Sequence, residues 1–396
     1  MSSMHLKRVH QSILILAIGL LTLLALFNAT LGFYRLAIAQ GYPNACDIEL
    51  RWRDAQYFIH GLDPTQPERL LNGVPKPDVC YPPWSLTVMP VFAPFPSFQI
   101  TRIYFALLNI VALGVLGRYL YRLMDRHGRS WSTFAALSFF AFSSNALCLS
   151  LGQFGIVLTA IIAVAFEMLE KDRQALAGVL LAVALVKPQL SGLFILIPFV
   201  RRQWITVSVA SVLLVGMTAF SGFWLQTNPL HILKRAFNGG VSYVDLAQNP
   251  FVLAVQNIFG STPSTFSMMV IGVIVCLICI YSLKNRLDTL SLMAIVAVVT
   301  MFWSYRRQYD LMPLVFLVAA TLRNALNTGF QTNWIAFGVC VASLWIPLRT
   351  IYTLNSGVQL VFAICWILAA ILLSLHRVPR KPSDKEDIES PRLAEA

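Results

Sequence analysis

Two kinds of charged side chain stand out in this sequence because together they could perform a group transfer. Asp47 and Asp54 lie in a long polar stretch, residues 46–84, in a chain that is otherwise mostly apolar. Lys187, Arg306 and Arg307 lie far downstream. A carboxylate can orient a hydroxyl group and remove its proton, and cations can stabilise a departing phosphate. The pattern therefore predicts transfer of a group from a phosphate to a hydroxyl acceptor.

Each of these two carboxylates also has a structural interpretation. Asp47 is either the catalytic base or the N-cap of a helix that we expect over residues 48–60. Asp54 follows seven residues later, about two helical turns, so it would share a helix face with Asp47 and compete for the role of base. Alternatively, Asp54 pairs with Arg51 or Arg53 on a solvated face.

The composition indicates an all-α polytopic membrane protein. Hydrophobic residues make up 57% of the 396 residues and charged residues only 12%, whereas a soluble domain has about 25% charged residues. Apolar stretches of about 18 residues or more, the length of a membrane span, recur along the chain. We expect one integral membrane domain over residues 1–375 and a disordered cytoplasmic tail over residues 376–396. The net charge of +12 reflects basic loops on the cytoplasmic side and does not indicate nucleic acid as a partner.

We expect about twelve crossings and one short, proline-rich element at 82–95, which either re-enters the membrane or lies at its surface. Lys187-Pro188 should divide residues 174–200 into two short helices, because the residue before a proline avoids the helical conformation. A folded first outer loop, 38–81, and a second, 226–262, would form the active-site face. The other expected spans are 12–35, 98–123, 131–148, 154–169, 204–225, 264–283, 289–303, 311–325, 333–349 and 357–375.

Several basic residues fall on the outer side of this topology, against the usual charge bias. They either bind an anion or extend from helix ends to the membrane surface. Arg306 and Arg307 could alternatively pair with Asp310. Arginine cannot act as an acid or base near neutral pH, but its guanidinium can hold a phosphate through two hydrogen bonds. The set consists of Lys187, Lys234, Arg235, Arg306, Arg307 and Arg349.

Other kinds of site have weaker support. Cys46 and Cys80 flank the polar stretch and form either a disulfide, if the loop faces an oxidising compartment, or two free thiols. The sequence has no glycine-rich phosphate loop, and its six histidines do not have the spacing of metal ligands. We therefore expect no metal-ligand residues, no cofactor and no nucleotide donor, and the sequence leaves divalent-metal dependence undecided.

Several different short motifs follow one another along the chain. Asp47 is followed by Trp52 and Tyr57, and then come Gly61-Leu62-Asp63-Pro64, Tyr81-Pro82-Pro83-Trp84, Leu151-Gly152-Gln153 and Lys187-Pro188. In these features the chain resembles glycosyltransferase family 87, polytopic enzymes of the GT-C superfamily that use polyprenyl-phosphate sugars. The chain departs from the family at Trp303-Ser304-Tyr305-Arg306-Arg307, where the family often has a pair of histidines.

The resemblance implies a GT-C-like bundle in the cytoplasmic (inner) membrane with its active site facing the outer side. A mannose-type sugar would pass from a polyprenyl-phosphate donor to a lipid-linked or glycan acceptor, with inversion and with Asp47 as the base. Lys187, Arg306 and Arg307 would hold the phosphate. Gln153, Tyr81 and Trp84 are further candidates for substrate binding, although Gln153 could instead satisfy the backbone of a turn and Trp84 could belong to an interfacial aromatic belt. The alternative function is that of a transporter or lipid flippase, in which charges and broken helices also occur.

Overall fold

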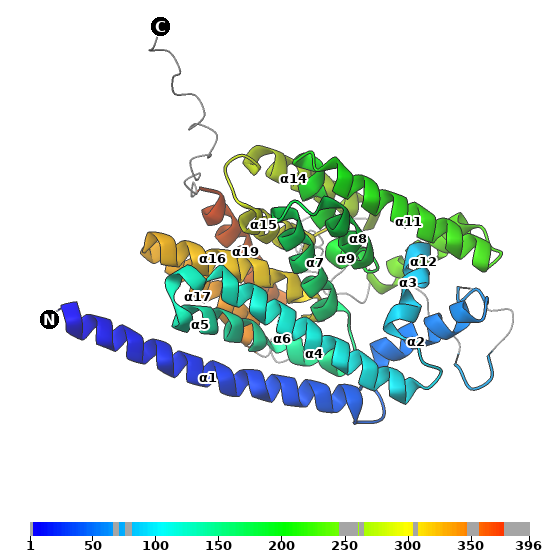
Figure 1. Cartoon of the computed structure of the whole chain (residues 1–396), viewed down its shortest axis with the longest axis horizontal. Coiled ribbons are helices and arrows are strands. Elements are labelled where there is room, and N and C mark those ends of the chain that lie inside the picture. The colour runs from blue at the N-terminus through cyan, green and yellow to red at the C-terminus, as the bar shows by residue number, and fades with distance from the viewer. Residues whose placement is uncertain are drawn as a thin grey trace, which may run out of the picture.

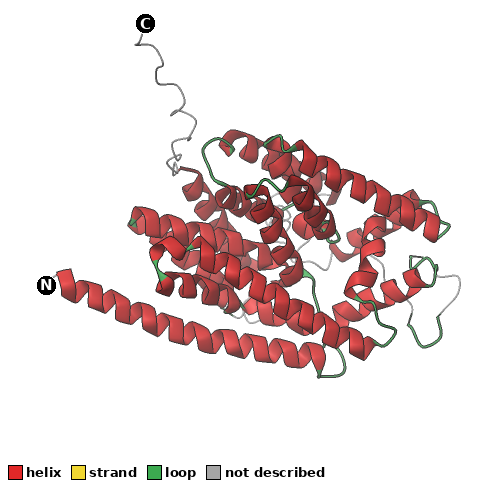
Figure 2. Cartoon of the chain, viewed as in Figure 1, coloured by secondary structure: helices red, strands yellow, loops and turns green. Residues whose placement is uncertain are grey.

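The computed structural model describes residues 3–65, 71–75, 81–244, 260, 265–303, 308–346 and 356–375. Every regular element within these ranges is a helix, and none is a strand (Figure 2). The expected all-α class is therefore confirmed. Arg306, Arg307, Arg349 and Cys80 lie outside the described residues, as does the tail 376–396.

Long helices form the body of the molecule. α1 (Ser3–Ala37), α4 (Phe98–Leu123) and α11 (Trp204–Trp224) have similarly inclined axes along its length, and α4 begins beside the end of α1 (Figure 1). Two further long helices are α14 (Thr265–Leu283) and α19 (Ser356–Leu375). Their exposed side chains include large apolar ones such as Leu23, which is 67% exposed. Such surfaces suit a lipid environment.

Five helical segments are long and apolar enough to cross a membrane, and a sixth is obtained if α5 and α6, which are bent by 47°, count as one span. These segments make the chain a multi-pass membrane protein, but the expected number of about twelve crossings is not confirmed. Several of the remaining helices, such as α8 and α15, have only 11 and 12 residues, whereas a full crossing needs about 20.

The shorter helices fill the space between the long ones and cap the two ends of the bundle. Their bounds are α2 Cys46–Ile59, α3 Pro83–Phe92, η1 Asp125–His127, α5 Arg129–Phe140, α6 Ser143–Leu151, α7 Gly155–Glu170, α8 Gln174–Ala184, α9 Pro188–Ser191, η2 Gly192–Ile195, α10 Leu196–Val200, α12 Pro229–Val244, α15 Thr289–Thr300, η3 Gln308–Leu314, α16 Val315–Thr328 and α17 Gln331–Trp345.

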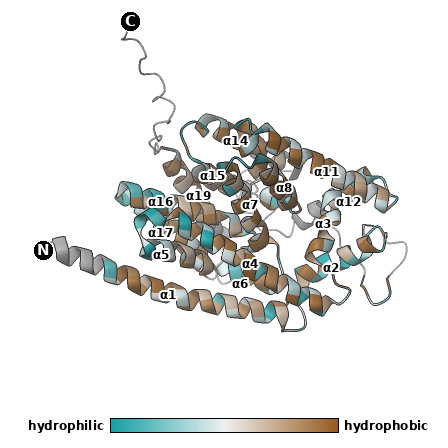
Figure 3. Cartoon of the chain, in the orientation of Figure 1, coloured by the Kyte–Doolittle hydropathy of each residue, from teal (hydrophilic) through white to brown (hydrophobic). Residues whose placement is uncertain are grey.

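The two ends of the bundle differ in what they hold. We call the end where α1 stops the site end, and there Gln99 of α4 donates a hydrogen bond to the carbonyl of Ala37 at 2.8 Å. α2 and α3 cross the bundle at this end (Figure 1). At the opposite end the helix turns carry ion pairs such as Lys171–Glu167 at 2.5 Å. Hydrophilic residues also gather around the turn between α16 and α17, away from the apolar long helices (Figure 3).

The short proline-rich segment at 82–95 forms α3, a helix of 10 residues. This length is far below the roughly 20 residues of a crossing. α3 buries Leu86 and Met89 completely, and Thr87 donates its hydroxyl to the Met217 carbonyl of α11 at 3.0 Å. The segment is therefore a short helix packed within the bundle rather than a span.

The break at Lys187-Pro188 is confirmed, since α8 ends at Ala184 and α9 begins at Pro188. Proline has no backbone N–H, so the Ala184 carbonyl loses its helical donor, and it accepts instead from the Ser191 hydroxyl at 2.6 Å. An unpaired backbone carbonyl inside a membrane protein is costly. The break therefore depends on donors supplied by side chains.

Three side chains from other parts of the chain supply further donors to the break. Trp84 donates its indole N–H to the Leu185 carbonyl at 2.8 Å. Ser85 donates its hydroxyl to the Val186 carbonyl at 2.7 Å. The Trp303 indole donates to the Gln189 carbonyl at 2.9 Å. The start of α3 and the segment that follows α15 are thereby fixed to the broken helix.

Gly152 brings the first polar loop against the turn between α6 and α7. Its φ of 72° is in the left-handed region, which favours glycine. A Cβ atom at Gly152 would lie 2.4 Å from Cγ2 of Ile48 in α2, and the Ala45 N–H donates to the Ser150 carbonyl at 2.7 Å. The first turn of α2 therefore lies directly on the Leu151-Gly152-Gln153 turn.

We expect Gly152→Ala to be more destabilising than Gly329→Ala. Both glycines end helices with similar φ values, 72° and 68°, so both substitutions carry left-handed strain of about 1–2 kcal/mol. A Cβ at Gly329 meets nothing within 4 Å, whereas at Gly152 the clash with Ile48 adds about 1–3 kcal/mol of overpacking. Thermal unfolding of the purified variants checks this order, and equal losses would contradict the close contact between Gly152 and α2.

Candidate active site

Asp47 lies in the first turn of α2 at the site end and is half-buried. The helix expected over 48–60 is observed from Cys46 to Ile59, and its N-cap residue is Ala45, so Asp47 is not the N-cap. The positive end of a helix dipole favours negative charge in the first turn. Asp47 therefore occupies a position that suits an ionised carboxylate and is partly exposed.

Asp54 is completely buried and forms an ion pair with Arg51 at 2.5 Å. The guanidinium of Arg51 also lies over the ring of Tyr81, 4.3 Å from its centre. The expected pairing with Arg51 is confirmed, but the interpretation that it lies on a solvated face is wrong, because both side chains are nearly inaccessible. Arg51, paired with Asp54 in the same helix, therefore connects α2 to the Tyr81-Pro82-Pro83-Trp84 motif.

Lys187 is the centre of a buried polar cluster at the helix break. Its side chain is 2% exposed, and its ammonium lies 2.5 Å from Oδ1 of Asp310. It also donates to Oε1 of Gln153 at 3.0 Å and lies 5.1 Å from the centre of the Tyr309 ring. The break, the Leu151-Gly152-Gln153 turn and η3 are thus joined by one ammonium group.

Asp310 has a partner that the sequence analysis did not name, because its carboxylate binds Lys187. The alternative of an ion pair between Asp310 and Arg306 or Arg307 falls on residues outside the described ranges and stays a prediction. Both arginines lie outside the described residues, so their phosphate-binding role stays a prediction. They precede Asp310 by four and three residues in the sequence, so the chain tethers them to the residue that binds Lys187.

A short path of contacts joins Asp47 to Lys187. Ile48, the neighbour of Asp47, packs on Gly152, and Gln153, the neighbour of Gly152, binds the Lys187 ammonium. The structure therefore connects the segments that carry a predicted base and a predicted phosphate ligand, which are far apart in the sequence. Their roles in substrate binding and catalysis stay predictions.

Tyr81 and Trp84 have contacts that serve the fold. Tyr81 packs against Arg51, and the indole N–H of Trp84 donates a hydrogen bond to the Leu185 carbonyl. Ser85, Ser191, Trp303 and Asp310 were not among the predicted site residues, although they hold the break or its lysine. One signal in the sequence could have revealed Asp310, because a lysine in an apolar helix usually has an acidic partner nearby.

The Gly61-Leu62-Asp63-Pro64 turn connects the two polar loops. Asp63 accepts hydrogen bonds from the N–H and the hydroxyl of Thr65 at 2.8 and 2.6 Å. Its other carboxylate oxygen lies 3.3 Å from Nη1 of Arg235 in α12. Arg235, one of the basic residues expected to bind an anion, therefore has an acidic partner in the chain.

Cys46 is a free thiol at the start of α2. Cys80 lies outside the described residues; of the two alternatives for Cys46, disulfide or free thiol, the free thiol is the one observed. Burial, and secondarily the negative charge of Asp47, raises the pKa of Cys46 to about 12. Within the described part of the chain, no three side chains of His, Cys, Asp or Glu come close enough together to hold a metal ion.

An apolar groove of about 350 Å³ lies between α14, α15 and α19. Gly272 and Phe302 line it, and a Cβ at Gly272 would lie 2.3 Å from Cβ of Trp303. Trp303 in turn binds the Gln189 carbonyl at the helix break. One part of the groove is therefore close to the Lys187 cluster, and its lining suits a hydrocarbon chain.

Comparison with known protein families identifies one match to this chain. The model of Glycosyltransferase family 87 matches residues 80–304, which is more than half of the 396 residues. The match includes the Tyr81, Gly152 and Lys187 motifs and leaves out Asp47 and Asp310. No individual curated protein matches the chain.

We expect the Lys187–Asp310 pair to behave as a coupled buried pair. Lys187→Met or Asp310→Leu alone leaves an uncompensated buried charge and should cost about 3–5 kcal/mol of unfolding free energy, whereas the double variant should recover much of that loss. Denaturant titration of the four proteins measures the coupling. Lys171→Met is the control, because its ion pair is half-exposed and worth at most about 1 kcal/mol. Additive losses in the double variant would contradict the pairing.

We expect the Cys46 thiol to alkylate slowly at neutral pH. With a pKa of about 12, the reactive thiolate is a minor species at pH 7, and its fraction rises about tenfold for each unit of pH up to that pKa. Iodoacetamide labelling of the Cys46 peptide, followed by mass spectrometry between about pH 7 and 9, measures the profile. Because Asp47 raises this pKa, Asp47→Asn should increase the rate at each pH. A plateau near pH 8 would contradict the assignment.

Proposed function

Because the chain belongs to glycosyltransferase family 87, we propose that it transfers a sugar from a polyprenyl-phosphate donor to a lipid-linked or glycan acceptor. We further propose that the sugar is mannose-type and that the site end faces the outer side of the inner membrane. Membership in this family makes the protein a membrane glycosyltransferase, and it favours that function over the alternative of a transporter or flippase.

One observation carries the proposal for the site. A half-buried carboxylate on α2 lies beside a turn whose glutamine binds a buried ammonium. Glycosyl transfer from a phosphate needs both a base for the acceptor and positive charge for the leaving group. Asp47 and Lys187 are candidates for these two needs, and the Gly152 contact holds their segments together.

In the proposed mechanism, Asp47 accepts the proton of an acceptor hydroxyl. The hydroxyl oxygen attacks the anomeric carbon from the face opposite the phosphate, and the bond between that carbon and the phosphate oxygen breaks. The electron pair leaves with the polyprenyl phosphate, the configuration inverts, and Asp47 later gives its proton to solvent. Asp54 is the weaker candidate for the base because it is fully buried and paired with Arg51.

Lys187, Arg306 and Arg307 would each contact the phosphate. Asp310 and Gln153 use two of the three N–H donors of Lys187, and we assign the third to a phosphate oxygen. Arg306 and Arg307 would provide the bidentate contacts. In this arrangement Asp310 is a positioning residue, because it acts on the phosphate through Lys187.

The donor's hydrocarbon chain would lie in the groove between α14, α15 and α19. That groove passes Phe302, next to the tryptophan that contacts the helix break. A chain bound there would place its phosphate end toward Lys187. The groove thus supplies an apolar binding surface that a water-soluble nucleotide sugar would not need.

We expect Asp47→Asn to abolish transfer without unfolding the protein. Loss of a general base lowers a rate by about 10²–10⁴-fold. The measurement uses purified protein in nanodiscs with radiolabelled polyprenyl-phosphate mannose and a membrane lipid extract. Glu49→Gln is the matched control, since Glu49 lies in the same helical turn and pairs with Arg53; it should retain activity.

The outcomes separate the parts of the proposal. An active Asp47→Asn protein would overturn the base assignment while leaving the enzyme class intact. If wild type transfers no mannose, arabinose and glucose donors test the sugar. Failure with every polyprenyl-phosphate donor, combined with transfer from a nucleotide sugar, would overturn the proposed donor class.

A further inference from the structure

The helix α12 begins where a membrane-spanning segment ends. α11 is long and apolar enough to cross a membrane, and only residues 225–228 separate its end at Trp224 from the start of α12 at Pro229. α12 lies beside this end of α11 and next to α3 (Figure 1). The contact is close, because a Cβ atom at Gly222 would lie 2.7 Å from Cδ of Pro229. α12 therefore starts at the level where α11 leaves the bilayer.

Exposed aromatic side chains mark this level on α11. Phe223 is 80% exposed, and the partly exposed Trp224 stacks on Phe220 with the ring centres 6.1 Å apart. The indole N–H of Trp224 donates to the Phe58 carbonyl at 2.6 Å. Tryptophan is enriched where a membrane span meets the headgroup region. The end of α11 therefore has the composition expected at the boundary between membrane and water.

The first two turns of α12 have a buried side and an exposed side. Ile232 and Ala236 are buried, and Ile232 packs with apolar side chains of α2 and α3. Leu230, which is 68% exposed, shares the other side with the exposed Leu233 and Lys234, since residues three and four apart lie on one helix face. One face thus fixes α12 to the protein, and the other presents two leucines and a lysine.

Two adjacent basic residues of α12 have different surroundings. Nη1 of Arg235 lies 3.3 Å from Oδ2 of Asp63 and donates to the Thr65 hydroxyl at 2.9 Å. Lys234 is exposed, and no acidic side chain within the described ranges forms an ion pair with it. The described part of the protein therefore compensates the charge of Arg235 but leaves that of Lys234 to its surroundings.

We propose that the exposed face of α12 binds the surface of the bilayer, with Leu230 and Leu233 at the edge of the acyl chains and the Lys234 ammonium on the phosphate of an anionic phospholipid. Amphipathic helices lie in this plane, with apolar side chains toward the acyl chains and lysines at the headgroups. The methylene groups of lysine can follow apolar surface while the ammonium reaches a charged group. The exposed apolar surface of α11 continues into this face, and the positive charge of Lys234 matches an anionic headgroup.

This contact would set the level of the membrane surface at the site end. Arg235 holds the Gly61-Leu62-Asp63-Pro64 turn, and Trp224 holds the last turn of α2 through the Phe58 carbonyl. The lipid-bound helix and the end of α11 would thus anchor the first polar loop to the bilayer. The binding itself does not depend on the proposed sugar transfer, and its test does not require an active enzyme.

The test uses the full chain in phosphatidylcholine nanodiscs that contain a small amount of a photoreactive lipid. The probe is either phosphatidylglycerol or phosphatidylcholine, and both carry the same diazirine in one acyl chain. Labelled peptides are mapped by mass spectrometry after digestion with pepsin, because Lys234→Gln removes a trypsin site. We expect α12 to take about fivefold more label from the phosphatidylglycerol probe, which is the effect of one lysine at an anionic surface.

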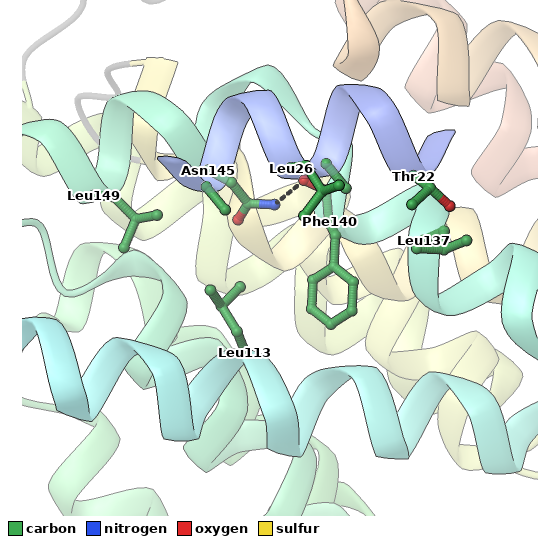
Figure 4. A pocket seen from close by; sticks show the side chains of 9 residues that line it. Thr22, Leu26, Leu113, Leu137, Phe140, Asn145 and Leu149 are labelled. Carbon is green, nitrogen blue, oxygen red and sulfur yellow. Dashed lines mark hydrogen bonds between the residues drawn. The ribbon is translucent and has the colours of Figure 1, made fainter. Parts of the chain in front are cut away.

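Peptides of α1 provide an internal control for general contact with lipid. Leu26 of α1 lines an apolar cavity of about 260 Å³ together with side chains of α4, α5 and α6 (Figure 4). None of the residues that line this cavity is charged. Peptides that contain Leu26 should therefore take equal label from the two probes.

Lys234→Gln should remove the preference of α12 for phosphatidylglycerol while label from both probes continues. Lys284→Gln is the matched control, because Lys284 follows α14 and lies over the Tyr281 ring; it should leave the preference of α12 unchanged. Equal labelling of α12 by the two probes in the wild type would overturn the contact between Lys234 and the phosphate. Absence of label on α12 from both probes would overturn the membrane contact as a whole, and a dimeric mass would then identify a second copy as the occupant.

Discussion

The helix break at Pro188 is the constraint on which much of this structure depends. In an apolar bundle every backbone carbonyl released by a break needs a donor. Ala184, Leu185, Val186 and Gln189 receive theirs from side chains of three segments: α9, the start of α3, and the residues that follow α15. The break thus brings distant parts of the chain to one place. The Tyr81-Pro82-Pro83-Trp84 motif owes part of its position to this need.

A buried charge adds a second requirement at the same point. Lys187 is nearly inaccessible, and an unpaired ammonium there would be strongly destabilising. Asp310 and Gln153 compensate it, and in doing so they bring η3 and the Leu151-Gly152-Gln153 turn to the break. Because Ile48 of α2 packs on Gly152, the fold holds the first turn of α2, which carries Asp47, against the turn that binds Lys187. Fold stability and the proposed chemistry therefore use the same contacts.

The bend between α5 and α6 follows the same physical rule with different residues. Asn28 of α1 donates to the carbonyls of Ala141 and Phe142 at 2.9 and 3.3 Å, and Asn145 serves those of Phe139 and Phe140. Two asparagines thereby satisfy four consecutive carbonyls at a 47° bend. At the breaks, polar side chains donate hydrogen bonds to the backbone carbonyls that lack a helical donor. Asn145 keeps one acceptor, Oδ1, without a hydrogen-bond partner among the described residues.

The sequence by itself determined the helical class, the position of the break at Lys187-Pro188 and the helix that carries Asp47. These features depend on local composition and on the conformational limits of proline, so neighbouring residues suffice to predict them. The tertiary structure decided that Lys187 pairs with Asp310, that Asp54 is buried with Arg51, and that Trp84 serves a backbone carbonyl. It also decided how many helices are long enough to span a membrane. Which side chain pairs with a polar group depends on which helices pack together. Lys187 and Asp310 are separated by more than a hundred residues in the sequence, so their pairing is decided by tertiary packing.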